Sequence, residues 1–251
     1  LAGLAGRTFI VQVYDYAENV NTYRVTLGEE LGVDIDSYYV ALNQLDLKWY
    51  GMNGDGSELI SIAAQDIYAA EYVAGYVFAF DNAADQGANL YAMPADDPGD
   101  VTLVGTMKNP SAEGHDFYVG DMAYSDMDQT MYFLYYVDDG RSYYPFLATV
   151  DIYTGETETI GRLGATVAGL TIDTDGNFYG IVKGDDYYLV QYTADTYDAP
   201  VQVGETPVAA GVEIPGWVSL AWDAAKGKIV MADSQAMYFV LGGEEYYMKD
   251  S

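Results

Sequence analysis

Acidic residues and Asn recur at short spacing in several predicted turns, where their oxygens could bind a cation. Asp173, Asp175 and Asn177 place side-chain oxygens at alternate positions, as calcium-binding loops do. No Glu follows at the twelfth position of this loop, so the spacing is not that of an EF-hand. Asp, Asn and Gly also form hairpin turns because their backbones tolerate turn geometry. We therefore expect a hairpin turn at 173–177, with bound Ca²⁺ or Na⁺ as the alternative.

A second group of residues could bind a ligand through aromatic rings. Arg141, Tyr143 and Tyr144 lie in the stretch VDDGRSYYP at 137–145. Aromatic rings offer flat apolar faces with a polar edge, and loops on a rigid scaffold are where binding residues concentrate. The sequence predicts a carbohydrate or protein ligand at this loop, with Trp217 and Asp121 as further ligand contacts. The alternative is a hairpin loop without a ligand, with the rings packed between strands.

Composition excludes several classes of function. The 251 residues include 39 acidic and 10 basic ones, a formal net charge of -29. Such a charge repels nucleic acids and anionic membranes, whose recognition needs Lys and Arg. The chain has no Cys, which removes disulfides and thiolate chemistry, and its one His, His115, disfavours a His-based metal site or triad. No stretch has the pattern of a membrane-spanning helix. We expect His115 to lie in a polar loop without a role of its own.

These residues must be positioned by a repeated unit of four short strands. The unit is clearest at 169–204, where apolar alternation is interrupted by turns at 173–177 and 184–186. Similar sequence segments occur before and after it. The apolar residues that align in the third strand of each unit are Leu47, Leu90, Leu147, Leu189 and Met237. A period of about 40–50 residues with four strands per unit is typical of a β-propeller. We expect one all-β domain over residues 1–251, built of four-stranded antiparallel blades.

Five blades are expected, at 67–107, 117–163 and 167–206, with one before these and one from Trp217 onward. In the first blade, 23–27 and 37–42 would precede the strands at 47–52 and 58–62. This leaves 9–16 as a spare strand, which we expect to complete the final blade and close the ring. Six blades remain possible if the first residues form a degenerate blade of their own.

Carboxylate catalysis is an alternative function for such an architecture. Some five-bladed propellers are glycosidases with acids around the axis. By the repeat alignment the innermost strands begin near Tyr68, Asp121, Gly169 and Ser219, and only one of these is acidic. Asp66, Glu71 and Glu213 lie nearby in the sequence but not at equivalent positions. A glycoside hydrolase or lyase acting at the mouth of the central channel therefore stays an alternative to a binding module.

One pair of segments also resembles a known group of proteins. Residues 150–161 (VDIYTGETETIG) and 169–180 (GLTIDTDGNFYG) resemble the repeats of secreted and surface bacterial β-propeller proteins. The resemblance implies the fold and an extracellular or cell-surface location, with an interaction role in a larger exported chain. We therefore expect a non-enzymatic binding or scaffold module, monomeric or part of a larger chain, with no cofactor other than possible Ca²⁺. A purely structural spacer is a further alternative.

Overall fold

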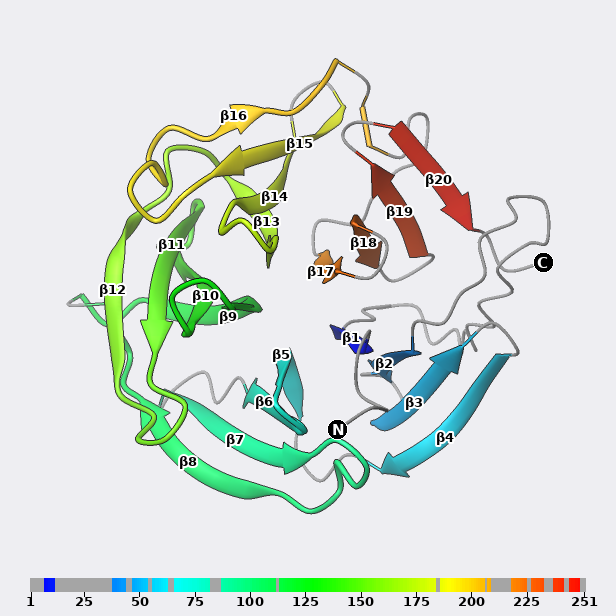
Figure 1. Ribbon diagram of the computed structural model, residues 1–251. Helices are drawn as coiled ribbons and strands as arrows, with labels where there is room; N and C mark the ends of the chain where they lie inside the picture. The colour runs from blue at the N-terminus through cyan, green and yellow to red at the C-terminus, as the bar shows by residue number, and fades with distance from the viewer. Residues whose placement is uncertain are drawn as a thin grey trace.

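The strands of this protein are grouped into four-stranded sheets. The computed structural model describes residues 7–11, 38–43, 47–53, 56–62, 66–81, 87–111, 113–183, 186–205, 207–208, 218–224, 227–232, 237–241 and 244–248. Within these residues the elements are all β-strands, in five sheets of four (Figure 1). None of the described segments forms a helix with the length and apolar character needed to span a bilayer.

Each sheet is a run of four consecutive strands. The first contains β1 (Arg7–Val11), β2 (Tyr38–Asn43), β3 (Lys48–Asn53) and β4 (Gly56–Ile62). The second contains β5 (Ile67–Val73), β6 (Tyr76–Asp81), β7 (Ala88–Pro94) and β8 (Thr102–Met107). The third contains β9 (Asp116–Ser125), β10 (Thr130–Asp138), β11 (Tyr143–Val150) and β12 (Thr157–Arg162). The fourth contains β13 (Val167–Ile172), β14 (Phe178–Lys183), β15 (Tyr187–Tyr192) and β16 (Val201–Gln202). The fifth contains β17 (Ser219–Asp223), β18 (Lys228–Ala232), β19 (Met237–Leu241) and β20 (Glu244–Met248).

Tight turns connect the strands where the sequence has turn residues. The β5–β6 hairpin closes over Ala74 and Gly75, which both have positive φ (51° and 95°) and pair Val73 with Tyr76. Two residues with positive φ give the turn whose twist matches that of the flanking strands. The β13–β14 turn has Gly176 at φ 81°, as the Asp-Gly pair there predicts.

The first strand of each sheet lies toward the centre of the arrangement (Figure 1). Strand β9 contacts β5 and β13, and β13 contacts β17. Strand β1 contacts both β5 and β17, the first strands of the second and fifth sheets. The sheets thus radiate from a common centre, with their first strands innermost.

The N-terminal strand is the main departure from the expected topology. It pairs with β2 of the first sheet, in parallel orientation, instead of completing the last sheet. The last sheet obtains its fourth strand from β20, which pairs with β19. The last sheet therefore has four strands without the N-terminal strand. The expected strand at 23–27 lies outside the described residues.

The core consists of apolar side chains packed between neighbouring sheets. Phe80 of the second sheet lies 5.0 Å from Phe133 of the third, centroid to centroid, and Tyr132 lies 4.7 Å from Phe178 of the fourth. Tyr135 and Tyr136 are both buried although they are adjacent in β10. Successive residues of a strand face opposite sides of the sheet, so both sides of this sheet are covered. Alternation along a strand allows one ring of such a pair to face solvent, but here both rings are packed.

Candidate functional site

The two ends of the innermost strands define two faces of the molecule. In an antiparallel run, the turns after the first and third strands lie at the same end. We call this end the pocket face; it comprises the turns at 74–75, 95–101, 126–129, 151–156 and 173–177. The opposite end, with the segments at 108–115, 139–142 and 163–166, is called the loop face.

A pocket of about 450 Å³ opens at the centre of the pocket face. It is lined by the ends of four innermost strands and the turns that follow them: β5, β9, β13 and β17. The volume lies in the range of small-molecule sites. Its polar and aromatic lining includes Glu71, Tyr72, Tyr124, Asp126, Asp173 and Trp222.

Glu71 is the most perturbed acid of this pocket. Its Oε1 accepts a hydrogen bond of 2.7 Å from the amide of Tyr72. Burial raises the pKa of Glu71 to about 8, and the charges of Asp121 and Asp126 add to the rise against hydrogen bonds from the backbone at Tyr72 and Tyr124. Glu71 is therefore largely protonated at neutral pH, whereas exposed Asp126 provides an ionisable neighbour.

Asp173 lines the same pocket, but its oxygens are used by its own turn. Oδ1 accepts from the amides of Asp175 and Asn177 at 2.9 and 2.8 Å. Oδ2 accepts from the Asn177 side-chain amide at 2.9 Å and from the Tyr179 hydroxyl at 3.0 Å. These bonds are those of a hairpin turn, as expected at 173–177. Among the described residues, no group of three or more His, Cys, Asp or Glu side chains is arranged to hold a metal ion.

Asp121 lies below this pocket, in the interior of β9, and connects three sheets. Its side chain is 1% exposed. Oδ2 accepts from the amides of Leu170 and Leu220 at 2.8 and 2.9 Å, in the fourth and fifth sheets. Oδ1 accepts from the Ser219 hydroxyl and the Met122 amide, both at 3.1 Å. Burial raises the pKa of Asp121 to about 7, although each of these hydrogen bonds lowers it. This geometry indicates that the carboxyl group stabilises the contacts between the three sheets.

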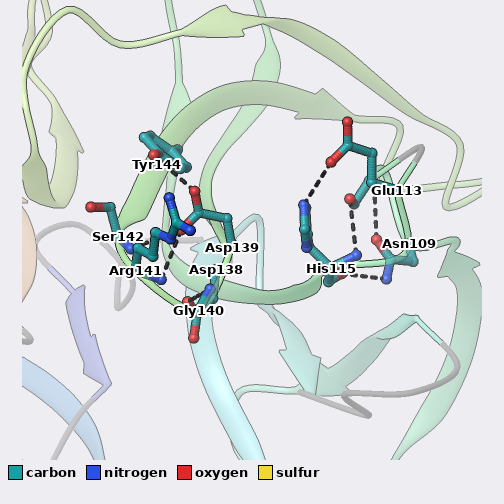
Figure 2. Close-up of polar contacts among 10 residues, drawn as sticks. Asn109, Glu113, His115, Asp138, Asp139, Gly140, Arg141, Ser142 and Tyr144 are labelled. Atoms are coloured by element: carbon teal, nitrogen blue, oxygen red, sulfur yellow. Dashed lines mark hydrogen bonds and ion pairs between the residues drawn. The ribbon is translucent and has the colours of Figure 1, made fainter.

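On the loop face, the β10–β11 hairpin is held by Asp139 (Figure 2). Its Oδ1 accepts from the amides of Arg141 and Ser142 at 2.8 and 2.9 Å, and its Oδ2 from the Tyr144 hydroxyl at 3.0 Å. These amide bonds lower the pKa of Asp139. The ring of Tyr144 also lies under the Arg162 guanidinium, 4.2 Å from its centroid. Tyr143 is 46% exposed, and its ring centroid lies 6.2 Å from that of Tyr118. This hairpin thus presents one tyrosine to solvent from a fixed backbone.

The segment around His115 lies near the same hairpin (Figure 2). The Asn109 side chain donates to the His115 carbonyl at 2.8 Å and accepts from the Ser111 amide at 2.8 Å. The His115 ring is 2.9 Å from a carboxylate oxygen of Glu113. The electrostatic influence of His115 on Asp139 joins the two segments in one surface.

The predicted site residues do not form a single site. Arg141, Tyr143 and Tyr144 lie on the loop face, the 173–177 turn lies on the pocket face, and Asp121 is buried between them. Trp217 lies outside the described residues. Trp49 is 0% exposed and belongs to the apolar core between the first and second sheets, so its ring is closed to a ligand.

Sequence reasoning did not single out Glu71 and Asp126 as pocket partners. The innermost strands begin at Ile67, Asp116, Val167 and Ser219, so β9 starts five residues earlier than the repeat alignment places it. Register shifts interrupt the pairing in β5 and β9 as well. Aligning the repeats on the hairpin turns at which these strands end would have brought Glu71 and Asp126 together as pocket residues.

Comparison with known proteins supports the fold. No protein-family model and no curated protein sequence matches this chain. A gluconolactonase from Xanthomonas campestris has a TM-score of 0.52 at 9% identity, over 82% of this chain and 69% of its own. A GH43 endo-arabinanase from Bacillus licheniformis has a TM-score of 0.50 at 14% identity, over 73% of this chain and 76% of its own.

A structural-genomics protein of unknown function from Bacteroides thetaiotaomicron has a TM-score of 0.48 at 12% identity. The match covers 80% of this chain and only 55% of that protein, so the present chain spans about half of its length. The gluconolactonase and the arabinanase are β-propeller-like proteins. At such identities the likeness shows the fold alone, an all-β arrangement of the propeller type.

Proposed function

We propose that residues 1–251 form a single five-bladed β-propeller that acts as a non-enzymatic binding or scaffold module. The five described sheets, and the place of β1 beside both β5 and β17, support a ring closed at the N-terminal strand. In this proposal the ring closes through contacts of β1 with its neighbours on either side. The repeat resemblance of 150–180 supports a bacterial exported chain, extracellular or at the cell surface, with the module as a monomer or part of a larger protein.

The ligand is a carbohydrate or a protein, bound through the loop face. The observation that carries this proposal is the 46% exposed ring of Tyr143 on a hairpin held by Asp139. A preformed backbone reduces the entropy lost on binding, and an exposed ring on it provides stacking area. Arg141 and His115 lie on the same face and provide donors for hydroxyl, carboxylate or carbonyl groups. The charge of -29 argues against nucleic acid as the ligand.

The test is a binding screen with a matched pair of tyrosine variants. The protein is applied to an array of neutral and acidic oligosaccharides and to bacterial cell-wall preparations. Tyr143→Ala is expected to weaken any specific signal at least about tenfold, the scale of a lost aromatic anchor. Tyr76→Ala is the control, because Tyr76 is 50% exposed but lies at the pocket-face end of β6. A specific signal that Tyr143→Ala leaves unchanged would refute the loop face as the binding surface.

A glycoside hydrolase or lyase is the second candidate, favoured by Glu71 and Asp126 at the central pocket. Inverting and retaining glycosidases pair a protonated acid with an ionised carboxylate. Glu71, with its pKa of about 8, suits the acid, and exposed Asp126 suits the carboxylate. Asp173 suits neither role because protein donors occupy both of its oxygens.

Because the similar solved structures include an endo-arabinanase and a gluconolactonase, arabinan and gluconolactone are the first substrates to test. Release of reducing ends or opening of the lactone, abolished by Glu71→Gln, would establish this candidate over the binding module. Absence of turnover on both, together with saccharide binding that depends on Tyr143, would favour the module. A structural spacer predicts neither turnover nor Tyr143-dependent binding.

A further inference from the structure

Charge is divided unequally between the two faces of the second, third and fourth sheets. Within the described part of residues 66–205, the Lys and Arg side chains are Lys108, Arg141, Arg162 and Lys183. Each belongs to a strand end or turn of the loop face, and His115 lies there too. The loop face of these sheets therefore has bases among its acids.

The pocket face of the same sheets has acids without bases. The turns at 126–129, 151–156 and 173–177 carry two acids each, and the turn at 95–101 carries three. No Lys, Arg or His occurs in these four turns, and none lines the central pocket. In the fifth sheet, Lys228 lies at this end, at the start of β18 and paired with Asp223 in the ladder. Like charges at this density repel one another unless a cation or a basic partner is bound.

Apolar groups are exposed on the same face, next to the pocket. Tyr153 is 87% exposed and Met127 is 67% exposed. Tyr124 lines the pocket, and burial together with the charge of Asp126 raises its pKa. The Met127 side chain lies over Gly176, where an added Cβ would be 2.6 Å from Met127 Cε. Both exposed side chains belong to pocket-face turns of the third sheet, and Met127 reaches across to the fourth sheet.

We infer that the pocket face docks a lysine- or arginine-rich segment of a partner protein, with one basic side chain entering the central pocket. Acidic turns around a concave pocket complement such a segment in charge and steer its approach. The long stem of Lys or Arg packs on rings and thioethers while its charged head reaches carboxylates, which matches Tyr153 and Met127 beside Asp126. This surface lies opposite the loop face, so the inference does not depend on the ligand proposed there.

The probe for this inference is a fluorescein-labelled peptide of six lysines, followed by fluorescence anisotropy. Asp126→Asn/Asp175→Asn removes two charges from the pocket face, at exposed carboxylates that accept no described hydrogen bond. Asp116→Asn/Glu205→Gln removes two exposed charges from the loop face and is the matched control. Thermal melts of both variants check that the fold is kept.

The pocket-face variant is expected to bind the peptide roughly threefold to tenfold more weakly, and the control less than twofold. Tyr153→Ala, which changes no charge, is expected to weaken binding about threefold. Acetylation of the lysines is expected to abolish binding. Equal weakening by both double variants would show attraction by net charge alone and would overturn the inference. Competition by spermidine at an affinity equal to that of the peptide would overturn it too, in favour of a small-molecule cation site.

Discussion

Replacing Asp121 by Ala is expected to destabilise the fold strongly, because one carboxyl group serves three sheets. The change leaves the amides of Leu170 and Leu220 without their acceptor in buried surroundings. An unsatisfied buried donor costs about 1–3 kcal/mol, so two main-chain amides cost about 2–6 kcal/mol in free energy of unfolding. The Ser219 hydroxyl can rotate toward another acceptor and adds less. A loss of about 4 kcal/mol corresponds to a melting temperature roughly 8–16 °C lower for a chain of this size.

The size of this loss should depend on pH. The pKa of Asp121 is about 7 in the folded protein, against 3.8 for an Asp side chain in water. The folded protein therefore holds a proton that the unfolded chain has released between about pH 4 and pH 7. The stability that this group contributes is complete below about pH 4 and declines as the pH rises through about 7. The Ala variant should consequently lose more at pH 5.5 than at pH 8.

Urea unfolding at pH 5.5 and pH 8, followed by tryptophan fluorescence, measures both effects. Asp121→Asn keeps one carbonyl acceptor and no ionisation, so it should fall between the natural protein and the Ala variant. Asp96→Ala, at an exposed turn, is the control and should stay within about 0.5 kcal/mol of the natural protein. An Asp121→Ala variant as stable as this control at pH 5.5 would refute the bridging role of the carboxyl group.

Three further predictions concern the pocket acid, the Asp turn and a contact between sheets. Glu71→Gln should reduce the fall in melting temperature between pH 5 and 8. Burial raises the pKa of Glu71 from 4.5 to about 8, so the stability that its protonation provides is lost across that window. An unchanged pH dependence would mean that Glu71 is solvated. Chelator should leave the melting temperature within about 1 °C, since protein donors occupy both oxygens of Asp173 and metal linkage would otherwise add stability; a marked drop would establish a calcium site. Gly155→Ala should cost about 2–4 kcal/mol, because its φ is 73° and its Cβ would lie 2.6 Å from Gly105 Cα. Gly140→Ala has φ 78° and no neighbour within 4 Å, so it should cost only about 1 kcal/mol in the same melts.

The sheets from β5 to β18 could be predicted because their signals are local. Alternating apolar residues and Asp-Gly turns placed the units at 67–107, 117–163 and 167–206, close to the observed strands. The pairing of β1 with β2 could not be predicted this way, because partner choice depends on contacts distant in sequence. The strand pattern of 9–16 predicts pairing with the edge of a sheet, but it does not indicate which sheet.

The site was harder to predict because it depends on register between sheets. Glu71 and Asp126 belong to different units and meet only when four innermost strands end at one pocket. Tyr side chains also have a role that the sequence pattern does not predict. Acids near turns accept hydrogen bonds from Tyr hydroxyls, as in the pairs of Tyr132 with Asp128 at 2.7 Å and Tyr91 with Asp81 at 3.0 Å. These bonds explain how a chain rich in both residue types uses them together.

The close approach of Gly105 and Gly155 bears on how neighbouring sheets are angled. These two glycines bring the outer margins of the second and third sheets together, backbone against backbone. Nearer the centre, the rings of Phe80 and Phe133 keep the same two sheets apart. The angle between the two sheets depends on their spacing at these two distances from the centre. Large rings set the inner spacing, and bare backbone sets the outer one. Because tilts accumulate from one sheet to the next, a residue without a side chain at the periphery helps to determine how many sheets fit around one axis.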